Sequence, residues 1–165
     1  MTQHAPVLIV LLPLTASLLC MLFSRISKFL GSWIVMAFYG GAFANACIVL
    51  QRVLESGGKT WHYWMGGWEP PIGIEFALDP LNSILAVVVT FISLMVSLYS
   101  RPFVKDEDWL HVGGYYTLFG LLTVGLSGMI ITGDVFNLYV YLEIMSLSGY
   151  GLIALGGRKS MLAAL

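Results

Sequence analysis

The side chain with the clearest capacity for chemistry in this sequence is Glu143, which lies alone among apolar and small residues between Val135 and Leu155. Counting from Asp134, a residue type that favours helix N-caps, to Leu155 gives about 22 residues, or roughly 33 Å of helix, which is enough to cross a bilayer. Glu143 then lies roughly 13 Å along this helix, close to mid-membrane. An ionisable group at that depth costs about 2.5 kcal/mol or more to insert, and apolar surroundings favour a protonated carboxyl group. Glu143 is therefore predicted to carry a proton.

The helical period predicts which side chains surround this carboxyl group. A period of 3.6 residues places two phenols, one hydroxyl and three apolar side chains on its face: Tyr139, Tyr150, Ser146, Phe136, Val140 and Leu147. We expect Tyr139, Ser146 and Tyr150 to shape the surroundings of Glu143 or to order water there. Asp134 and Asn137 lie at the helix start, where we expect a cap or an entrance. The alternative for Glu143 is structural, a hydrogen bond that holds neighbouring helices together.

Composition identifies the class of protein that holds this helix. Of 165 residues, 58% are hydrophobic and only 10% are charged, and the mean hydropathy is +0.86. These values indicate an integral membrane protein. The net charge of -1 says nothing about partners, and no cluster of basic residues suggests a nucleic-acid partner. Cys20 and Cys47 form no metal-binding or disulfide motif, so we expect no metal and no cofactor.

The hydropathy pattern predicts an all-α membrane domain over residues 1–165. Five transmembrane helices are expected, over residues 6–23, 29–50, 81–100, 113–131 and 134–156. The first is predicted to be retained, because no Lys or Arg precedes Arg25 as it would in a signal peptide.

The segment from residue 51 to residue 80 interrupts this pattern with polar residues, glycine pairs and tryptophans. Two short strands are predicted there, near Trp61 to Met65 and from Ile72 to Leu78, where apolar residues alternate with others. A β-hairpin on the membrane surface, with tryptophans as interfacial anchors, fits this segment. An aromatic-rich binding loop is the alternative.

The positive charges predict the orientation in the membrane. The loops after the first, third and fifth spans hold six Lys and Arg residues: Arg25, Lys28, Arg101, Lys105, Arg158 and Lys159. The other side holds only Arg52 and Lys59. The positive-inside rule then places the N-terminus and the 51–80 loop outside and the C-terminus in the cytoplasm, in a bacterial or archaeal cell membrane.

No Lys, Arg or His lies deep inside a predicted span, so Glu143 lacks a cationic partner within this sequence. An unpaired buried acid is unfavourable, and we expect other membrane subunits or further helices to supply the partner. The final residues, RKSMLAAL, look like the opening of another helix.

Two stretches carry a family resemblance: TGDVFNLYVYLEIMSLSGYGLIALGG, and before it GGWEPPIGIEFALDPL. They resemble the antiporter-like subunits shared by Mrp-type sodium/proton antiporters, respiratory complex I and membrane-bound hydrogenases, and most closely the D subunit of the Mrp antiporters. The resemblance covers nearly the whole chain. It implies a 14-helix subunit of which this sequence forms the first third.

In that family the acid on the fifth helix, here Glu143, pairs with a lysine on a later broken helix and takes part in proton transfer. No such lysine occurs here. The resemblance therefore implies either one product of a split gene, completed by a second polypeptide, or a fragment without transport of its own.

Three functions follow as hypotheses. The first is a subunit of a sodium/proton antiporter in which Glu143 accepts and releases a proton. The second is a proton-pumping membrane-arm subunit of a quinone reductase or a membrane-bound hydrogenase. The third, favoured by the missing lysine, is a structural or assembly subunit of a membrane complex.

Overall fold

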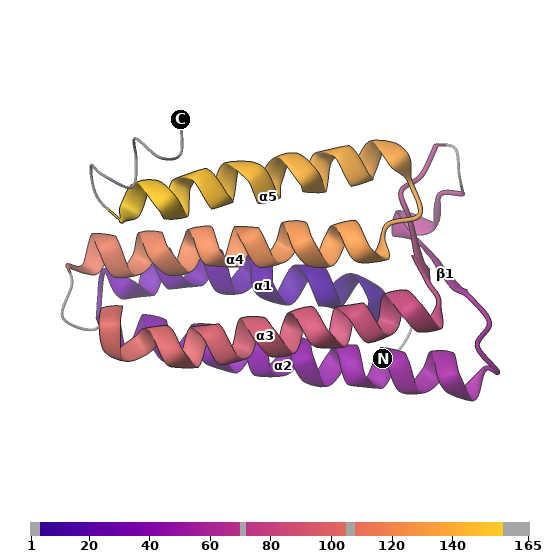
Figure 1. Ribbon diagram of the computed structural model, residues 1–165, viewed down its shortest axis with the longest axis horizontal. Coiled ribbons are helices and arrows are strands. Elements are labelled where there is room, and N and C mark those ends of the chain that lie inside the picture. The colour runs from indigo at the N-terminus through magenta and orange to yellow at the C-terminus, as the bar shows by residue number, and fades with distance from the viewer. Residues whose placement is uncertain (1–3, 70–71, 105–107, 157–165) are drawn as a thin grey trace.

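The computed structural model describes residues 4–69, 72–104 and 108–156, without the side chains of Lys28, Phe103 and Val104. Within them lie five helices long and apolar enough to cross a membrane. They are α1 (Ala5–Ser24), α2 (Lys28–Glu55), α3 (Pro80–Val104), α4 (Trp109–Ile131) and α5 (Val135–Leu155) (Figure 1). The predicted fold class is confirmed. Lys105, Arg158 and Lys159, which were used to predict orientation, lie outside the described residues.

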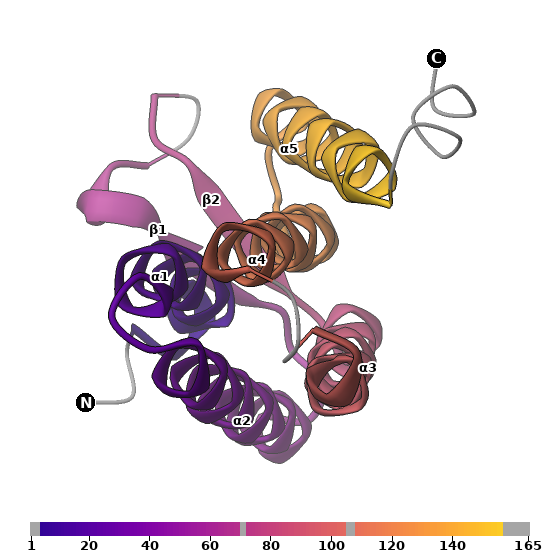
Figure 2. The same cartoon turned by 90° about the vertical axis from the view of Figure 1, so that its left-hand side faces the viewer.

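The helices run side by side, and successive helices are antiparallel (Figure 1). Seen end-on, α4 lies between α5 and the rest of the bundle, while α2 and α3 lie on the other side (Figure 2). α1 packs on α2 and α4, and α5 packs chiefly on α4. The outermost helix is therefore the one that carries Glu143.

Three helices extend beyond the predicted spans by about one turn. α2 continues to Glu55 instead of residue 50, and α3 continues to Val104 instead of residue 100. α4 likewise begins at Trp109, not at residue 113. Hydropathy marks where a chain leaves the apolar layer, but backbone hydrogen bonds can continue a helix into polar surroundings. The loop predicted from residue 51 therefore begins only after Glu55.

The loop between α2 and α3 forms the predicted hairpin. Strand β1 (Trp61–Trp64) pairs antiparallel with β2 (Glu75–Leu78), in a register that places Tyr63 opposite Phe76. A 3-10 turn, η2 (Met65–Gly67), follows β1. Alternate residues of β2, Phe76 and Leu78, are fully buried and join the core formed by the neighbouring helix ends. The hairpin therefore covers one end of the bundle.

Glycines allow α4 to approach its neighbours closely. A Cβ added at Gly120 would collide with the Ser17 hydroxyl of α1, and one at Gly128 would collide with the Tyr141 ring of α5. At Gly125 it would lie 2.8 Å from the backbone nitrogen of Met145. The glycine-rich sequence of α4 thus sets its distance from both α1 and α5.

Candidate functional site

The helix that carries Glu143 begins at a well-formed N-cap. The Asp134 carboxylate accepts hydrogen bonds from the backbone N–H groups of Phe136, at 3.1 Å, and Asn137, at 3.3 Å. Asn137 is buried, and its side-chain amide donates to the Thr132 hydroxyl at 3.1 Å. Asp134 and Asn137 are thus both tied into the turn between α4 and α5.

One face of α5 packs on α4. Its buried residues, Asn137, Tyr141 and Ser148, recur at helical spacing. Because successive residues are about 100° apart around a helix, Glu143 lies roughly 200° round the axis from Tyr141. Glu143 therefore faces away from the other four helices.

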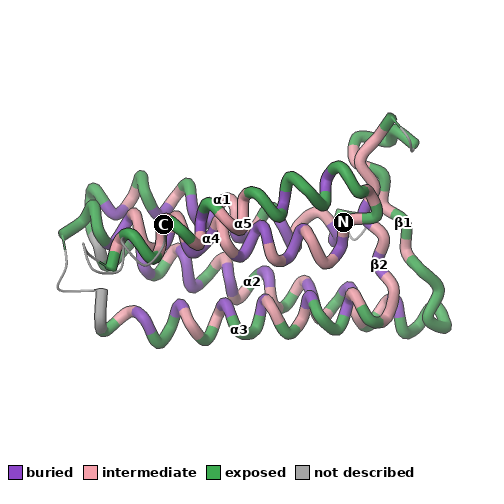
Figure 3. Tube along the Cα trace, turned by 45° about the horizontal axis from the view of Figure 1, so that its top comes forward, coloured by how far each residue is buried: buried purple, intermediate pink, exposed green. Residues whose placement is uncertain are grey.

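The face around Glu143 is uncovered along most of the helix (Figure 3). Tyr139 is 72% exposed and Tyr150 is 56% exposed. The apolar members predicted for this face are exposed as well: Phe136, Val140 and Leu147. Glu143 itself is exposed and makes no hydrogen bond or ion pair with any residue that the structure describes.

The polar groups around the carboxyl group differ in what they can still bind. The Ser146 hydroxyl donates to the carbonyl of Leu142 at 2.8 Å, so it remains able to accept a further hydrogen bond. The phenols of Tyr139 and Tyr150 each have a donor and an acceptor. This face can therefore surround a proton-carrying carboxyl group with hydrogen-bonding partners once an apolar layer or another helix covers it.

The hairpin holds the turn that begins α5, a relationship that the spacing of residues in the sequence does not predict. The backbone N–H of Gly133 donates to the carbonyl of Glu75 at 2.9 Å, and Phe76 forms a β-bridge with Thr132. A Cβ added at Gly133 would lie 3.2 Å from the Cβ of Ala77, so the glycine also permits close contact. Strand β2 thus continues as a ladder onto the α4–α5 turn.

A pair of titratable side chains, His62 of β1 and Glu75 of β2, joins the two strands of the hairpin. His62 Nδ1 lies 2.6 Å from Glu75 Oε1, and Trp64 Nε1 donates to the same oxygen at 3.3 Å. The His62 side chain is 53% exposed, whereas that of Glu75 is 19% exposed. The spacing of His62 and Glu75 in the sequence does not predict this contact, because only the antiparallel register brings β1 and β2 together.

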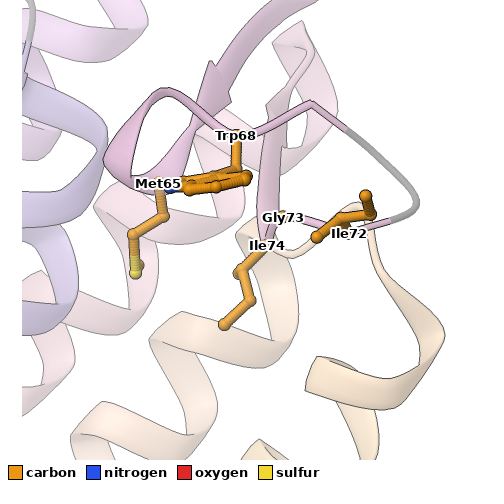
Figure 4. A pocket seen from close by; sticks show the side chains of 5 residues that line it. All are labelled: Met65, Trp68, Ile72, Gly73 and Ile74. Carbon is orange, nitrogen blue, oxygen red and sulfur yellow. The ribbon is translucent and has the colours of Figure 1, made fainter.

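A hollow of about 450 Å³ lies beside the hairpin. Its lining is apolar side chains and one glycine, namely Met65, Trp68, Ile72, Gly73 and Ile74 (Figure 4). Trp68 and Ile72 are exposed. The described residues of this lining include no acid, base or nucleophile.

A second polar assembly lies inside the bundle. The Tyr39 hydroxyl lies 3.4 Å from that of Thr123, which in turn donates to Ser93 at 3.2 Å. These three residues come from α2, α4 and α3 and are buried. No sequence motif identifies Ser93 as part of such an assembly. The regular spacing of hydroxyl residues along α3 was the signal for a larger network.

Comparison with known proteins is consistent with a membrane-arm subunit. A family model described as NADH-ubiquinone oxidoreductase (complex I), chain 5 N-terminus, matches residues 64–112. NADH-quinone oxidoreductase subunit N of Desulforudis audaxviator is 42% identical over 165 residues, which is the whole of this chain and 33% of that protein. The D subunit of the Na(+)/H(+) antiporter of Bacillus subtilis is 38% identical over 115 residues, 70% of this chain and 22% of that protein.

Solved structures show the same relationship. The membrane-bound sulfane sulfur reductase, an archaeal respiratory membrane complex, contains a chain with a TM-score of 0.88 and 29% identity, matched over 98% of this chain and 32% of its own length. The Mrp complex from Dietzia sp. contains one with a TM-score of 0.77 and 26% identity, over 92% of this chain and 27% of its own. The resemblance inferred from the sequence is confirmed. The chain spans about a third or less of these relatives.

Proposed function

We propose that this chain, a homologue of the N-terminal part of the antiporter-like membrane subunits of the Mrp and complex I type, acts in a sodium/proton antiporter complex. In this proposal Glu143 accepts and releases a proton at mid-membrane. The supporting observation is the uncovered face of α5, where a carboxyl group lies between two exposed phenols. Similarity to a sodium/proton antiporter subunit and to a chain of an Mrp complex supports the same function.

The proposal requires a partner for Glu143. Charged carboxylates in a membrane pair with cations or mark proton pathways. Among the described residues none pairs with Glu143, and its face is open to the outside of the bundle. A helix from other protein therefore covers this face in the working complex and brings a lysine to Glu143. Protonation of Glu143 would then weaken its ion pair with that lysine, which couples proton uptake to a change in the partner.

The direct test measures sodium-driven proton movement in membrane vesicles that hold this chain with its co-expressed membrane subunits. Glu143→Gln should abolish transport, because the amide keeps the shape but cannot carry a proton. Asp134→Asn should transport normally, because asparagine also caps helices. Glu55→Gln is a matched control on a carboxyl group at the exposed end of α2. Normal transport by Glu143→Gln would refute the role of Glu143 and favour a structural subunit.

A second candidate is a proton-pumping membrane arm of a redox complex. The specific observation in its favour is the 42% identity to an NADH-quinone oxidoreductase subunit over the whole chain. The same carboxyl group would serve, but electron transfer would replace the sodium gradient as the driving force. Purification distinguishes the two: a redox complex would bring the visible absorption of iron–sulfur clusters, and its proton movement would not require sodium.

A further inference from the structure

One face of α3 carries small polar side chains through most of the bundle. They recur at intervals of three, four or seven residues and are all buried: Ser83, Thr90, Ser93, Ser97 and Ser100. Such residues often serve helix packing, because a serine or threonine hydroxyl can bond to the carbonyl of its own preceding turn. Thr90 does so, donating to Ala86 at 2.7 Å. Helix packing alone thus accounts for some of these five residues, which together are called the polar row of α3.

At the middle of the row three hydroxyls from three helices meet. The hydroxyl oxygen of Tyr39 lies 3.4 Å from Oγ1 of Thr123, and that atom lies 3.2 Å from Oγ of Ser93. Thr123 also lies 3.0 Å from the carbonyl of Phe119, yet its hydroxyl has a single hydrogen and donates to one acceptor at a time. The cluster can therefore switch its direction of donation without moving heavy atoms.

Two further hydroxyls are buried without a partner. The Oγ atoms of Ser83 and Ser127 make no hydrogen bond to any atom of the described chain, and both residues are 0% exposed. Leaving a buried hydroxyl unbonded costs about 1–3 kcal/mol. Ser127 lies one helical turn from Thr123 on the same face of α4, and Ser83 lies on the polar face of α3. Both lie on the hairpin side of the cluster, because α3 begins and α4 ends there.

An acidic residue marks the hairpin end of this row. Asp79 is partly buried, and its carboxylate accepts from the backbone N–H of Asn82 at 2.7 Å. The N–H of Ser83 donates to the Asp79 carbonyl at 3.0 Å, which places Ser83 one turn below the carboxylate. The row thus runs from a charged group at the bundle end to neutral hydroxyls at its centre.

We propose that the interface of α3 with α2 and α4 binds a file of water molecules that extends from Asp79 to the cluster of Tyr39, Thr123 and Ser93. Water is the ligand that fits, because it both donates to and accepts from hydroxyls and supplies the partners that Ser83 and Ser127 lack. In such a file each oxygen accepts one hydrogen and donates another, so an excess proton can pass along it by successive transfers, after which the waters and hydroxyls rotate back before the next proton passes.

This route is distinct from the proposed function of Glu143. α5 packs on α4, and Figure 2 shows α3 on the far side of α4 from α5. The hydroxyls of the cluster carry no charge. The file therefore holds water and can conduct protons, but it does not store a proton. Its existence does not depend on the identity of the driving force or on the partner of Glu143.

The test is water-edited solid-state NMR on the full chain, with its co-purified membrane subunits, in liposomes and with serine and threonine labelled. Polarisation from water should reach the Cβ of Ser83 and Ser127 nearly as fast as that of exposed Ser56, and several-fold faster than that of Ser17. Ser17 is the matched control, since it is 1% exposed and its hydroxyl donates to Pro13. Transfer to Ser83 and Ser127 as slow as to Ser17 would overturn the proposal. This comparison is made within the unmodified chain and requires no variant.

A variant tests whether the cluster belongs to the file. Thr123→Val keeps the shape of the side chain and removes its hydroxyl, so transfer to Ser127 should fall several-fold. Thr117→Val is the control on the same helix, because the Thr117 hydroxyl donates to Ser17 of α1 at 3.1 Å instead. Unchanged transfer to Ser127 in Thr123→Val would show that the water is not shared with the cluster, and the file would be wrong.

Discussion

The backbone N–H of Gly133 donates a 2.9 Å hydrogen bond to the carbonyl of Glu75, and this contact joins the hairpin to the start of α5. Residues that are far apart in the sequence thereby form one ladder at the end of the bundle. The helix that presents Glu143 is thus held at one end by the loop between α2 and α3. A movement of the hairpin would be transmitted to the turn that begins α5.

Removing the buried ring of the hairpin should loosen this end of the bundle. Phe76 is 0% exposed, and its ring lies 6.4 Å from that of Tyr63 in a stacked arrangement. Phe76→Ala should lower the free energy of unfolding by roughly 3–5 kcal/mol, as for other buried aromatic residues. Denaturant titration in detergent measures this. Ile72→Ala, at an 81% exposed position of the same loop, should change stability little; equal effects of the two would contradict the buried position of Phe76.

The contact between α4 and α5 should not tolerate a methyl group at Gly125. A Cβ there would lie 2.8 Å from the backbone nitrogen and 2.9 Å from the Cα of Met145, which cannot turn aside as a side chain can. Gly125→Ala should therefore destabilise the chain by about 1–3 kcal/mol. A thermal unfolding midpoint in detergent provides the measurement.

Gly149→Ala is the matched control for that contact. A Cβ added at Gly149 of α5 would meet nothing within 4 Å in the described structure. Alanine is also favoured over glycine inside a helix. We expect the midpoint to stay the same or rise, and a fall as large as that of Gly125→Ala would show that the α4–α5 packing is not as described.

The contribution of the N-cap hydrogen bonds of Asp134 to stability should be separable from the contribution of its charge. Asp134→Ala removes an acceptor for two backbone N–H groups and should cost about 1 kcal/mol of stability. Asp134→Asn keeps a side-chain oxygen there and should retain most of that stability. The difference between the two unfolding free energies measures the cap. If both variants lose the same stability, the contribution comes from charge, and the two hydrogen bonds add little.

The orientation predicted from the positive charges can be checked with thiol labelling. Lys59 and Ser27 are exposed at opposite ends of the bundle. In intact cells a membrane-impermeant thiol reagent should modify a cysteine introduced as Lys59→Cys and should spare one introduced as Ser27→Cys. Buried Cys20 and partly buried Cys47 set the background, which the parent chain measures. The reverse pattern of labelling would place the hairpin in the cytoplasm.

Much of the architecture follows from the sequence because the bilayer constrains it strongly. Runs of about 20 apolar residues must form helices when lipid offers no hydrogen bonds to the backbone, so hydropathy alone located all five spans. Alternation of apolar residues likewise located the two strands. α2 and α3 continue past residues 50 and 100, where the predicted spans end, because a helix does not have to end where its side chains become polar.

The face that carries Glu143 was also determined by the sequence, because helical geometry alone fixes which residues share a side. Only the tertiary structure decided that this side is the uncovered one, and that Asn137, Tyr141 and Ser148 pack instead. The joining of Glu75 to Gly133 and the meeting of Tyr39, Thr123 and Ser93 also needed the folded chain. These contacts depend on how distant segments are placed against one another, and the local spacing of residues does not encode that placement.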